Sequence, residues 1–313
     1  MSAAHLIVVS LPGSRTPVVA GITGALGYAS LGTMSGDQSA GTRQPGPGEV
    51  YSLLTAAYGP ERAARLLKLS PNGVDREDLE PAFHDAVSAL WRVWWTRLGQ
   101  PVTHGSPVDP GAEARLARLP AAELLDLLPD RGCWYVTGLD LRRADADLLR
   151  VWHSGGRPPV VFHHRDIRDR IISQIRALTR PEGQVGSLPE HLVYRDILTA
   201  LPTLDARITL ALTDPGFPGM HEARRSQWLL RHPAVCVITD EELAGPAREE
   251  ALARLLRATG HTSLPAAALP PLAAPGDVPA DTGRALFTPA HDRLLRLHHG
   301  DLLPPLDAAT SMR

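Results

Sequence analysis

The residues best suited to chemistry follow an apolar run at residues 160–164. Arg165 comes directly after that run, and Asp166 is a favourable N-cap for a helix that starts there. Ser173 stands about two helical turns after Asp166, so its hydroxyl lies on the same side of the helix as the loop. A cation at a strand end, a helix amino terminus and a hydroxyl group can together hold one phosphate.

Two further segments combine a strand, a polar turn and a helix. Residues 10–17 read Ser-Leu-Pro-Gly-Ser-Arg-Thr-Pro after the apolar run Leu6–Val9, and Pro17 suits the first position of a helix. Residues 237–243 read Val-Ile-Thr-Asp-Glu-Glu-Leu, an apolar run that ends in acidic residues before another predicted helix. The sequence therefore predicts three strand ends that carry polar side chains.

The run Arg-Asp-x-Arg-Asp-x-x-x-Ser after an apolar strand resembles a motif of the nucleotide-dependent sulfotransferases. That family uses the motif to grip the 3′-phosphate of 3′-phosphoadenosine 5′-phosphosulfate (PAPS). The resemblance implies that Arg165 and Ser173 are the 3′-phosphate ligands. Ile167 stands where the family usually has a proline.

The amino-terminal segment looks like the family loop Pro-Lys-Ser-Gly-Thr-Thr, which holds the 5′-phosphosulfate with backbone N–H groups and hydroxyls. The resemblance implies that this group is contacted by Pro12, Gly13, Ser14, Arg15 and Thr16. The segment at residues 237–243 is similar to the family's strand ending in Tyr-Glu-Asp-Leu, which is a structural element. Gly283 and Arg284 resemble the carboxyl-terminal glycine–basic segment that closes over the nucleotide.

Two departures fall where the chemistry of the family takes place. The first is in the 5′ loop, where Gly13 replaces a lysine that neutralises charge on the bridging oxygen and Arg15 replaces a glycine. Lys68 is the only lysine in the chain. Either Arg15 supplies the missing charge from two residues away, or the loop has lost that role. An arginine is unfavourable there if the position requires a positive φ.

The second departure concerns the general base. The family commonly has a histidine in a Thr-His-Leu-Pro-like context, and the aligned residue here is Gly138. Asp140 is our first candidate for the base, and His104 is an alternative near a predicted strand end. His163 and His164 lie close to the phosphate loop, and one of them is expected to point into the core.

Short β-type runs alternate with helical segments, which predicts a three-layer α/β domain with a mostly parallel central sheet flanked by helices. The resemblance implies the same architecture, of the sulfotransferase or P-loop NTPase type. The predicted strands are Leu6–Val9, Pro101–His104, Cys133–Thr137, Pro159–His164, Arg207–Leu212 and Ala234–Thr239. Helices are predicted at Pro17–Tyr28, Glu49–Tyr58, Pro60–Leu69, Arg76–Leu98, Pro246–Thr259 and Pro289–His298, with one more starting at Asp166.

We expect a single domain over residues 1–313. A helical insertion at about 47–128 would build the acceptor site, and a Pro/Ala-rich loop at about 262–280 would wrap the domain. Aromatic residues of the helix at 76–98 are expected in the core. The apolar face of the helix after Asp166 is expected to pack on the sheet, through Ile167, Ile171, Ile175 and Leu178.

The composition gives no sign of a nucleic-acid or membrane partner. Hydrophobic residues make up 43% and charged residues 21%, with a net charge of −2 and a pI of about 6.7. Cys133 and Cys236 lie in apolar runs and are expected to be reduced core thiols, which favours a cytoplasmic location. The uncharged stretch between Arg15 and Asp37 keeps an export signal as an alternative. No metal-ligand spacing occurs, so we expect no metal.

Three functions remain open at this point. The first is transfer of a sulfuryl group from PAPS to a hydroxyl or amine of a small molecule. The second keeps the fold for a non-sulfonating reaction on a small molecule, such as cyclisation, elimination or hydrolysis. The third is a non-catalytic ligand-binding protein. The oligomeric state is also open, with a homodimer among the alternatives.

Overall fold

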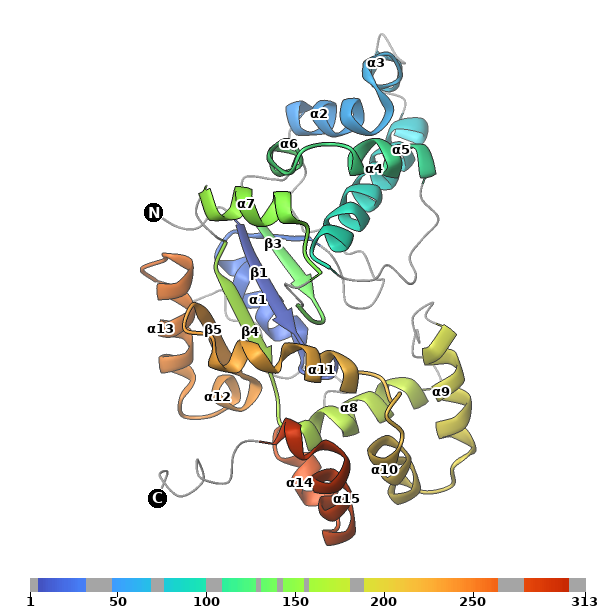
Figure 1. Cartoon of the computed structure of the whole chain (residues 1–313), viewed down its shortest axis with the longest axis vertical. Helices are drawn as coiled ribbons and strands as arrows, with labels where there is room; N and C mark the ends of the chain where they lie inside the picture. Colours follow the sequence, from blue (N-terminus) through green and yellow to red (C-terminus); the bar gives the residue numbers. More distant parts are fainter. Residues whose placement is uncertain are drawn as a thin grey trace.

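The structure is a computed structural model that describes residues 5–31, 47–68, 76–99, 109–127, 131–139, 143–154, 158–180, 189–263 and 279–303. Its centre is a five-stranded parallel sheet in the order β2-β3-β1-β4-β5 (Figure 1). The strands are β1 (His5–Ser10), β2 (Ala29–Leu31), β3 (Gly132–Val136), β4 (Val160–His164) and β5 (Val235–Thr239). The predicted α/β class, with a parallel sheet flanked by helices, is confirmed.

Alternate strand residues face opposite sides of the sheet, and helices cover both sides. Leu6 and Val8 of β1 share a core with α1 (Thr16–Ala25) and α13 (Arg248–Thr259). Ile7 and Val9 belong to a second core, on the face covered by α4 (Arg76–Arg97) and α7 (Ala146–Ser154). Because both faces are buried, the strands read as continuous apolar runs rather than as an alternating pattern.

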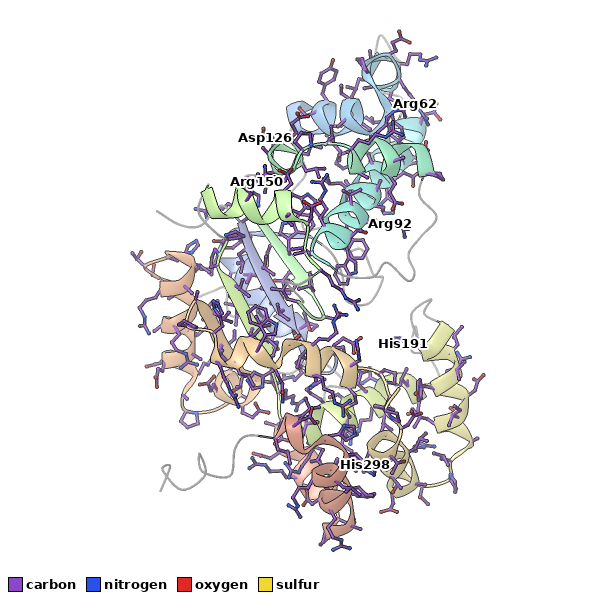
Figure 2. All side chains as sticks on the ribbon, viewed as in Figure 1. Arg62, Arg92, Asp126, Arg150, His191 and His298 are labelled. Atoms are coloured by element: carbon purple, nitrogen blue, oxygen red, sulfur yellow. The ribbon has the colours of Figure 1, made fainter. Side chains whose placement is uncertain are left out.

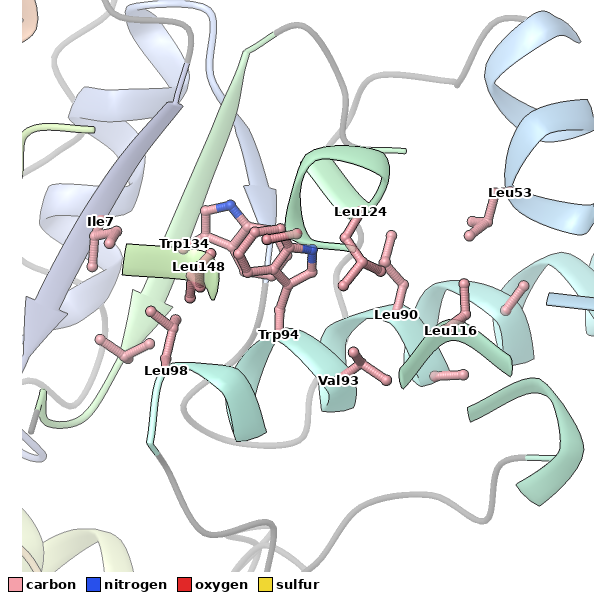
Figure 3. Packing of buried hydrophobic residues seen from close by; sticks show 14 of the residues in the cluster. Ile7, Leu53, Leu90, Val93, Trp94, Leu98, Leu116, Leu124, Trp134 and Leu148 are labelled. Carbon is pink, nitrogen blue, oxygen red and sulfur yellow. The ribbon is translucent and has the colours of Figure 1, made fainter. Parts of the chain in front are cut away.

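A helical group precedes β3 and packs into the second core. Besides α4 it comprises α2 (Pro47–Tyr58), α3 (Pro60–Lys68), α5 (Pro110–Ala117) and α6 (Ala121–Asp126). Trp94 of α4 is 1% exposed, and its ring centre lies 5.4 Å from that of Trp134 in β3 (Figure 3). Trp91 is partly buried against the same core. The predicted core role of these aromatic side chains is confirmed, and they attach the helical group to the sheet.

A second helical group lies at the opposite end of the molecule (Figure 1). It comprises α8 (Ile167–Thr179), α9 (Pro189–Ala200), α10 (Leu204–Thr213), α14 (Thr282–Leu286) and α15 (Pro289–His299). The apolar face of α8 packs on Leu198 of α9, Ile208 of α10 and Leu295 of α15, so the predicted packing on the sheet was wrong. Helical spacing determines which residues share a face, but it does not determine which element covers that face.

The predicted strand at residues 207–212 was also wrong, because these residues lie inside α10. The Thr203 hydroxyl caps that helix by accepting the N–H of Ala206 at 3.2 Å. Ile208, Ala211 and Leu212 are buried on one side, at helical spacing. This burial outweighs the β-type composition of the run.

The connection from β4 to β5 ends in α11 (Met220–Ser226) and the 3₁₀ helix η1 (Gln227–Arg231), and β5 leads into the short helix α12 (Asp240–Ala244). The other predicted elements agree with the structure to within a few residues. The predicted strand at 101–104 lies outside the described residues, as does most of the Pro/Ala-rich loop. No helix in the described ranges has the length and hydrophobicity needed to cross a membrane.

Candidate functional site

The candidate site lies at the carboxyl edge of the sheet, where the chain leaves β1 and β4. These strands are neighbours, and Ser10 is paired with His163 at their ends. The connection from β1 to β2 runs through α1 on one face, whereas that from β3 to β4 runs through α7 on the other face. Ligands of open parallel sheets bind in the crevice where the crossovers diverge in this way.

The loop between β1 and α1 contains two left-handed backbone conformations. Gly13 has φ 80°, and Arg15 has φ 58° with ψ 47°. A Cβ on Gly13 would lie 2.8 Å from the carbonyl oxygen of Arg170, so the loop rests on the first turns of α8. Position 13 therefore lacks both the backbone geometry and the space for a lysine. Arg15 does adopt the positive φ that is unfavourable for its residue type.

The hydroxyl groups of this loop differ in their partners. Ser14 is fully buried, and among the described residues its Oγ has no hydrogen-bond partner. Thr16 Oγ1 lies 2.7 Å from Ser10 Oγ, which in turn lies 2.9 Å from His163 Nδ1. A chain of hydrogen bonds therefore leads from the buried imidazole to the first turn of α1.

His163 and His164 occupy opposite faces of β4. Burial lowers the pKa of His163 to about 3, and the positive charges of Arg15 and Arg165 act in the same direction. The ring of His164 stacks on Phe162 at 5.2 Å, and burial lowers its pKa to about 4. Both imidazoles are therefore neutral near pH 7. His163, which is 0% exposed, is the histidine that points into the core, as one of the two was predicted to do.

Arg15 and Arg165 meet on the carboxylate of Asp240. Arg15 Nη1 donates to both carboxylate oxygens at 3.2 Å, and Arg165 Nε lies 3.2 Å from Oδ2. The side chains of Arg165 and Asp240 are 0% and 1% exposed. A capping box positions Asp240, since Thr239 and Glu242 exchange hydrogen bonds between side chain and backbone at the start of α12.

Arg165 and Ser173, the predicted 3′-phosphate ligands, are adjacent. Arg165 Nη1 donates to Ser173 Oγ at 3.3 Å, and Arg165 Nη2 lies 3.6 Å from Asp169 Oδ2. Asp169 also accepts the backbone N–H groups of Asp281, at 2.9 Å, and of Gly283. The fold thus brings the two predicted ligands together and pairs the guanidinium group with buried carboxylates.

The segment predicted to close over the nucleotide lies on α8. A Cβ on Gly283 would overlap the backbone of Arg168, so only glycine allows this approach. Arg284 follows with a side chain that is 66% exposed, 3.8 Å from Asp166 and 3.5 Å from Asp281. Arg15, Arg165, Asp169 and Asp240 form the arginine cluster. Gly283 lies next to this cluster, and Arg284 lies on its solvent side.

A cavity of about 660 Å³ opens beside this cluster. Apolar side chains of Leu11, Phe162 and Trp228 line part of it, and Glu241 lies on its polar side. Glu241 Oε1 accepts the N–H of Asp166 at 2.9 Å. Burial raises the pKa of Glu241, and the nearby acidic groups add to this, while the hydrogen bond opposes it. The volume is in the range of small-molecule sites.

Sequence reasoning missed Arg170 and gave the acidic strand end at 240–241 only a structural role. Arg170 is buried, and its guanidinium donates to the carbonyl oxygens of Pro12, at 3.1 Å, and Gly219, at 2.9 Å. Burial lowers its pKa to about 10. The signal in the sequence was the acidic pair Asp240 and Glu241 after an apolar run, but the sequence does not show which basic groups this pair meets.

The predicted base candidates, Asp140 and His104, lie outside the described residues. Gly138 is described, and a Cβ there would lie 3.3 Å from the Oγ of the buried Ser226. The space beside Gly138, the residue aligned with a histidine in the predicted resemblance, is thus occupied by a serine of α11.

The two histidines at the end of α15 have different environments. His298 is exposed (Figure 2), whereas His299 is buried, with Nε2 2.9 Å from the Leu212 carbonyl and Nδ1 accepting from Arg224 at 2.7 Å. His299 is therefore a satisfied structural residue. Within the described ranges, no group of three or more His, Cys, Asp or Glu side chains is arranged to hold a metal ion.

Comparison of the chain with known proteins finds no matching family model and no matching curated protein. The functional assignment therefore rests on the residues and the geometry described above.

Proposed function

We propose that this protein transfers a sulfuryl group from PAPS to a hydroxyl or amine group of a small molecule. The observation that carries the proposal is the meeting of Arg15 and Arg165 on Asp240, because it joins the loops that would hold the two ends of the nucleotide. Both loops leave neighbouring strands at the edge where parallel sheets bind phosphates. We also infer a cytoplasmic location, which the free thiols of Cys133 and Cys236 support.

In this proposal each end of the nucleotide has its own donors. Arg165 and Ser173 would bind the 3′-phosphate, and the backbone N–H groups at the start of α1 would bind the 5′-phosphosulfate with Ser14 and Thr16. The buried Ser14 hydroxyl has no partner among the described residues. Such a group is unfavourable by about 1–3 kcal/mol, and an oxyanion ligand would satisfy it.

In this proposal a phosphate replaces two contacts of Arg165. These are the hydrogen bond to Ser173, at 3.3 Å, and the ion pair with Asp169, at 3.6 Å, and both are longer than the usual 2.7–2.9 Å of charge-assisted contacts. A phosphate oxygen would replace these weak contacts, while Asp240 keeps the guanidinium in place. Arg15, fixed on the same carboxylate, would supply the positive charge that Gly13 lacks.

A second candidate function is a non-sulfonating reaction on a small molecule. Two observations favour it. The backbone of Arg170 excludes any side chain at Gly13, and Asp240 neutralises part of the charge of both arginines. Under this alternative the cluster would only stabilise the fold, and no nucleotide would bind to it.

Calorimetric titration with 3′-phosphoadenosine 5′-phosphate separates the two candidates. We expect the wild-type protein to bind this nucleotide, Arg165→Ala to weaken binding by at least 100-fold, and Ser173→Ala to weaken it by about 10-fold. The matched control is Arg195→Ala, because the Arg195 side chain on α9 is 43% exposed and lies outside the cluster.

Arg165→Ala leaves two buried carboxylates with fewer partners, so its folding is checked by circular dichroism. Ser173→Ala keeps every ion pair and tests the same site independently. Folded wild-type protein that does not bind the nucleotide at millimolar concentration would rule out sulfuryl transfer from this donor. Binding followed by turnover of PAPS with a panel of hydroxyl and amine acceptors would establish the enzyme rather than a nucleotide-binding protein.

A further inference from the structure

The cavity beside the arginine cluster has an apolar body and one acidic group, Glu241, that forms no ion pair with a described residue. Phe162 and Trp228 form part of its wall, together with Leu302 near the end of the described chain. The indole Nε1 of Trp228 donates to the Leu139 carbonyl at 3.0 Å, which fixes the ring near the end of β3. A fixed aromatic side chain in a concave site favours a ligand with a flat or apolar body.

Most charged groups that line the cavity are already paired. Asp166 lies 3.4 Å from Arg168, and Asp301 lies 3.2 Å from Arg224. The Arg165 guanidinium is held by buried carboxylates, and Arg170 donates to two backbone carbonyls. Each of these groups therefore has a partner among the described residues.

Glu241 differs from them. One of its oxygens accepts the Asp166 N–H, and in the described part of the chain it forms no ion pair with a basic side chain. Burial raises the pKa of Glu241, and the carboxylates of Asp240 and Asp166 add to this effect. Arg231 and Arg284 also line the cavity, but both side chains are exposed, so water screens their charge.

We propose that this cavity binds a small molecule with an apolar body and a protonated amine, with Glu241 as the ion partner of the amine. The cavity lies at the Arg165 end of the proposed nucleotide site, and no described residue of the helical group expected to build the acceptor site lines it. The inference therefore concerns a separate ligand and does not depend on the proposed function.

Three indole compounds that differ in the end group test the preference. Tryptamine carries a cationic amine, tryptophol a neutral hydroxyl and indole-3-acetate a carboxylate, and each is titrated into the full chain by calorimetry. We expect tryptamine to bind at least 10-fold more tightly than indole-3-acetate, with tryptophol between them. The order follows from a carboxylate that lacks a cation in a partly buried site.

Glu241→Gln is the decisive variant, because glutamine keeps an oxygen that can accept the Asp166 N–H but loses the negative charge. We expect it to weaken tryptamine binding by about 10-fold and to change tryptophol binding by less than 3-fold. Glu249→Gln is the matched control, since Glu249 is exposed on α13 and does not line the cavity. It should leave all three affinities unchanged.

The inference is overturned if indole-3-acetate binds as tightly as tryptamine, if Glu241→Gln leaves tryptamine binding unchanged, or if none of the three compounds binds. The comparison on wild-type protein does not depend on the folding of the variant. Titration of the same samples with 3′-phosphoadenosine 5′-phosphate keeps the two proposals apart. Nucleotide binding without the amine preference removes only this inference, and amine preference without nucleotide binding removes only the sulfuryl transfer.

Discussion

The guanidinium of Arg15 donates hydrogen bonds to both carboxylate oxygens of Asp240, which lies 225 positions later in the chain, at 3.2 Å each. The same carboxylate lies 3.2 Å from Arg165 Nε. One buried acidic group therefore connects the end of β5 to the loops that follow β1 and β4.

Replacing Asp240 by asparagine should destabilise the protein by about 3–5 kcal/mol. The substitution keeps the size of the side chain but leaves two buried guanidinium groups with an uncharged partner, and removing one member of a buried ion pair has costs of this order. The measurement is the free energy of unfolding in urea. Asp196→Asn is the control, because Asp196 is 75% exposed and should shift that free energy by less than about 0.5 kcal/mol. Equal effects of the two variants would show that the cluster does not stabilise the fold.

Alanine at position 13 should destabilise the protein by about 2 kcal/mol. The added Cβ meets the Arg170 carbonyl oxygen at 2.8 Å, and the backbone there has φ 80°, which alanine rarely adopts. Gly24→Ala is the matched control in α1, because a Cβ there meets no atom within 4 Å. It should raise stability by up to about 1 kcal/mol, through the higher helix propensity of alanine. Thermal unfolding of both variants checks the opposite signs, and a Gly13→Ala protein as stable as wild type would contradict the close contact.

Stability should fall as the pH drops from about 6.5, partly because of His163. Burial lowers the pKa of this histidine from 6.5 to about 3 in the folded protein. Between these values the unfolded chain binds a proton that the folded chain does not, so acid favours unfolding. From pH 6.5 to pH 4.5 the contribution is about 2–3 kcal/mol.

His163→Asn removes that titration and can keep a hydrogen bond to Ser10, so its unfolding free energy should vary less steeply over the same pH interval. Urea unfolding at several pH values gives both slopes. His298→Asn, at an exposed position on α15, should retain the wild-type slope. Parallel curves for wild type and His163→Asn would mean that the imidazole is not buried in its neutral form.

The sequence determined the local elements and the residues at their ends. Buried strands appear as apolar runs because both faces of a parallel sheet are covered. These runs were enough to predict β1, β3, β4 and β5 from the sequence. Asp166 was recognised as an N-cap because its side chain satisfies the free Arg168 N–H at the start of α8. These are interactions between residues a few positions apart, and spacing along the chain is enough to predict them.

Only the tertiary structure decided which groups meet. Arg15 and Arg165 were identified from their loops, but nothing near either residue indicates that Asp240 pairs with both. The sequence also did not indicate that α9, α10 and α15 cover α8. Nor did it indicate that Glu241 lines the cavity. The physical reason is that ion pairs and core contacts depend on distance in space, and the strand order β2-β3-β1-β4-β5 brings together segments that lie far apart in the sequence.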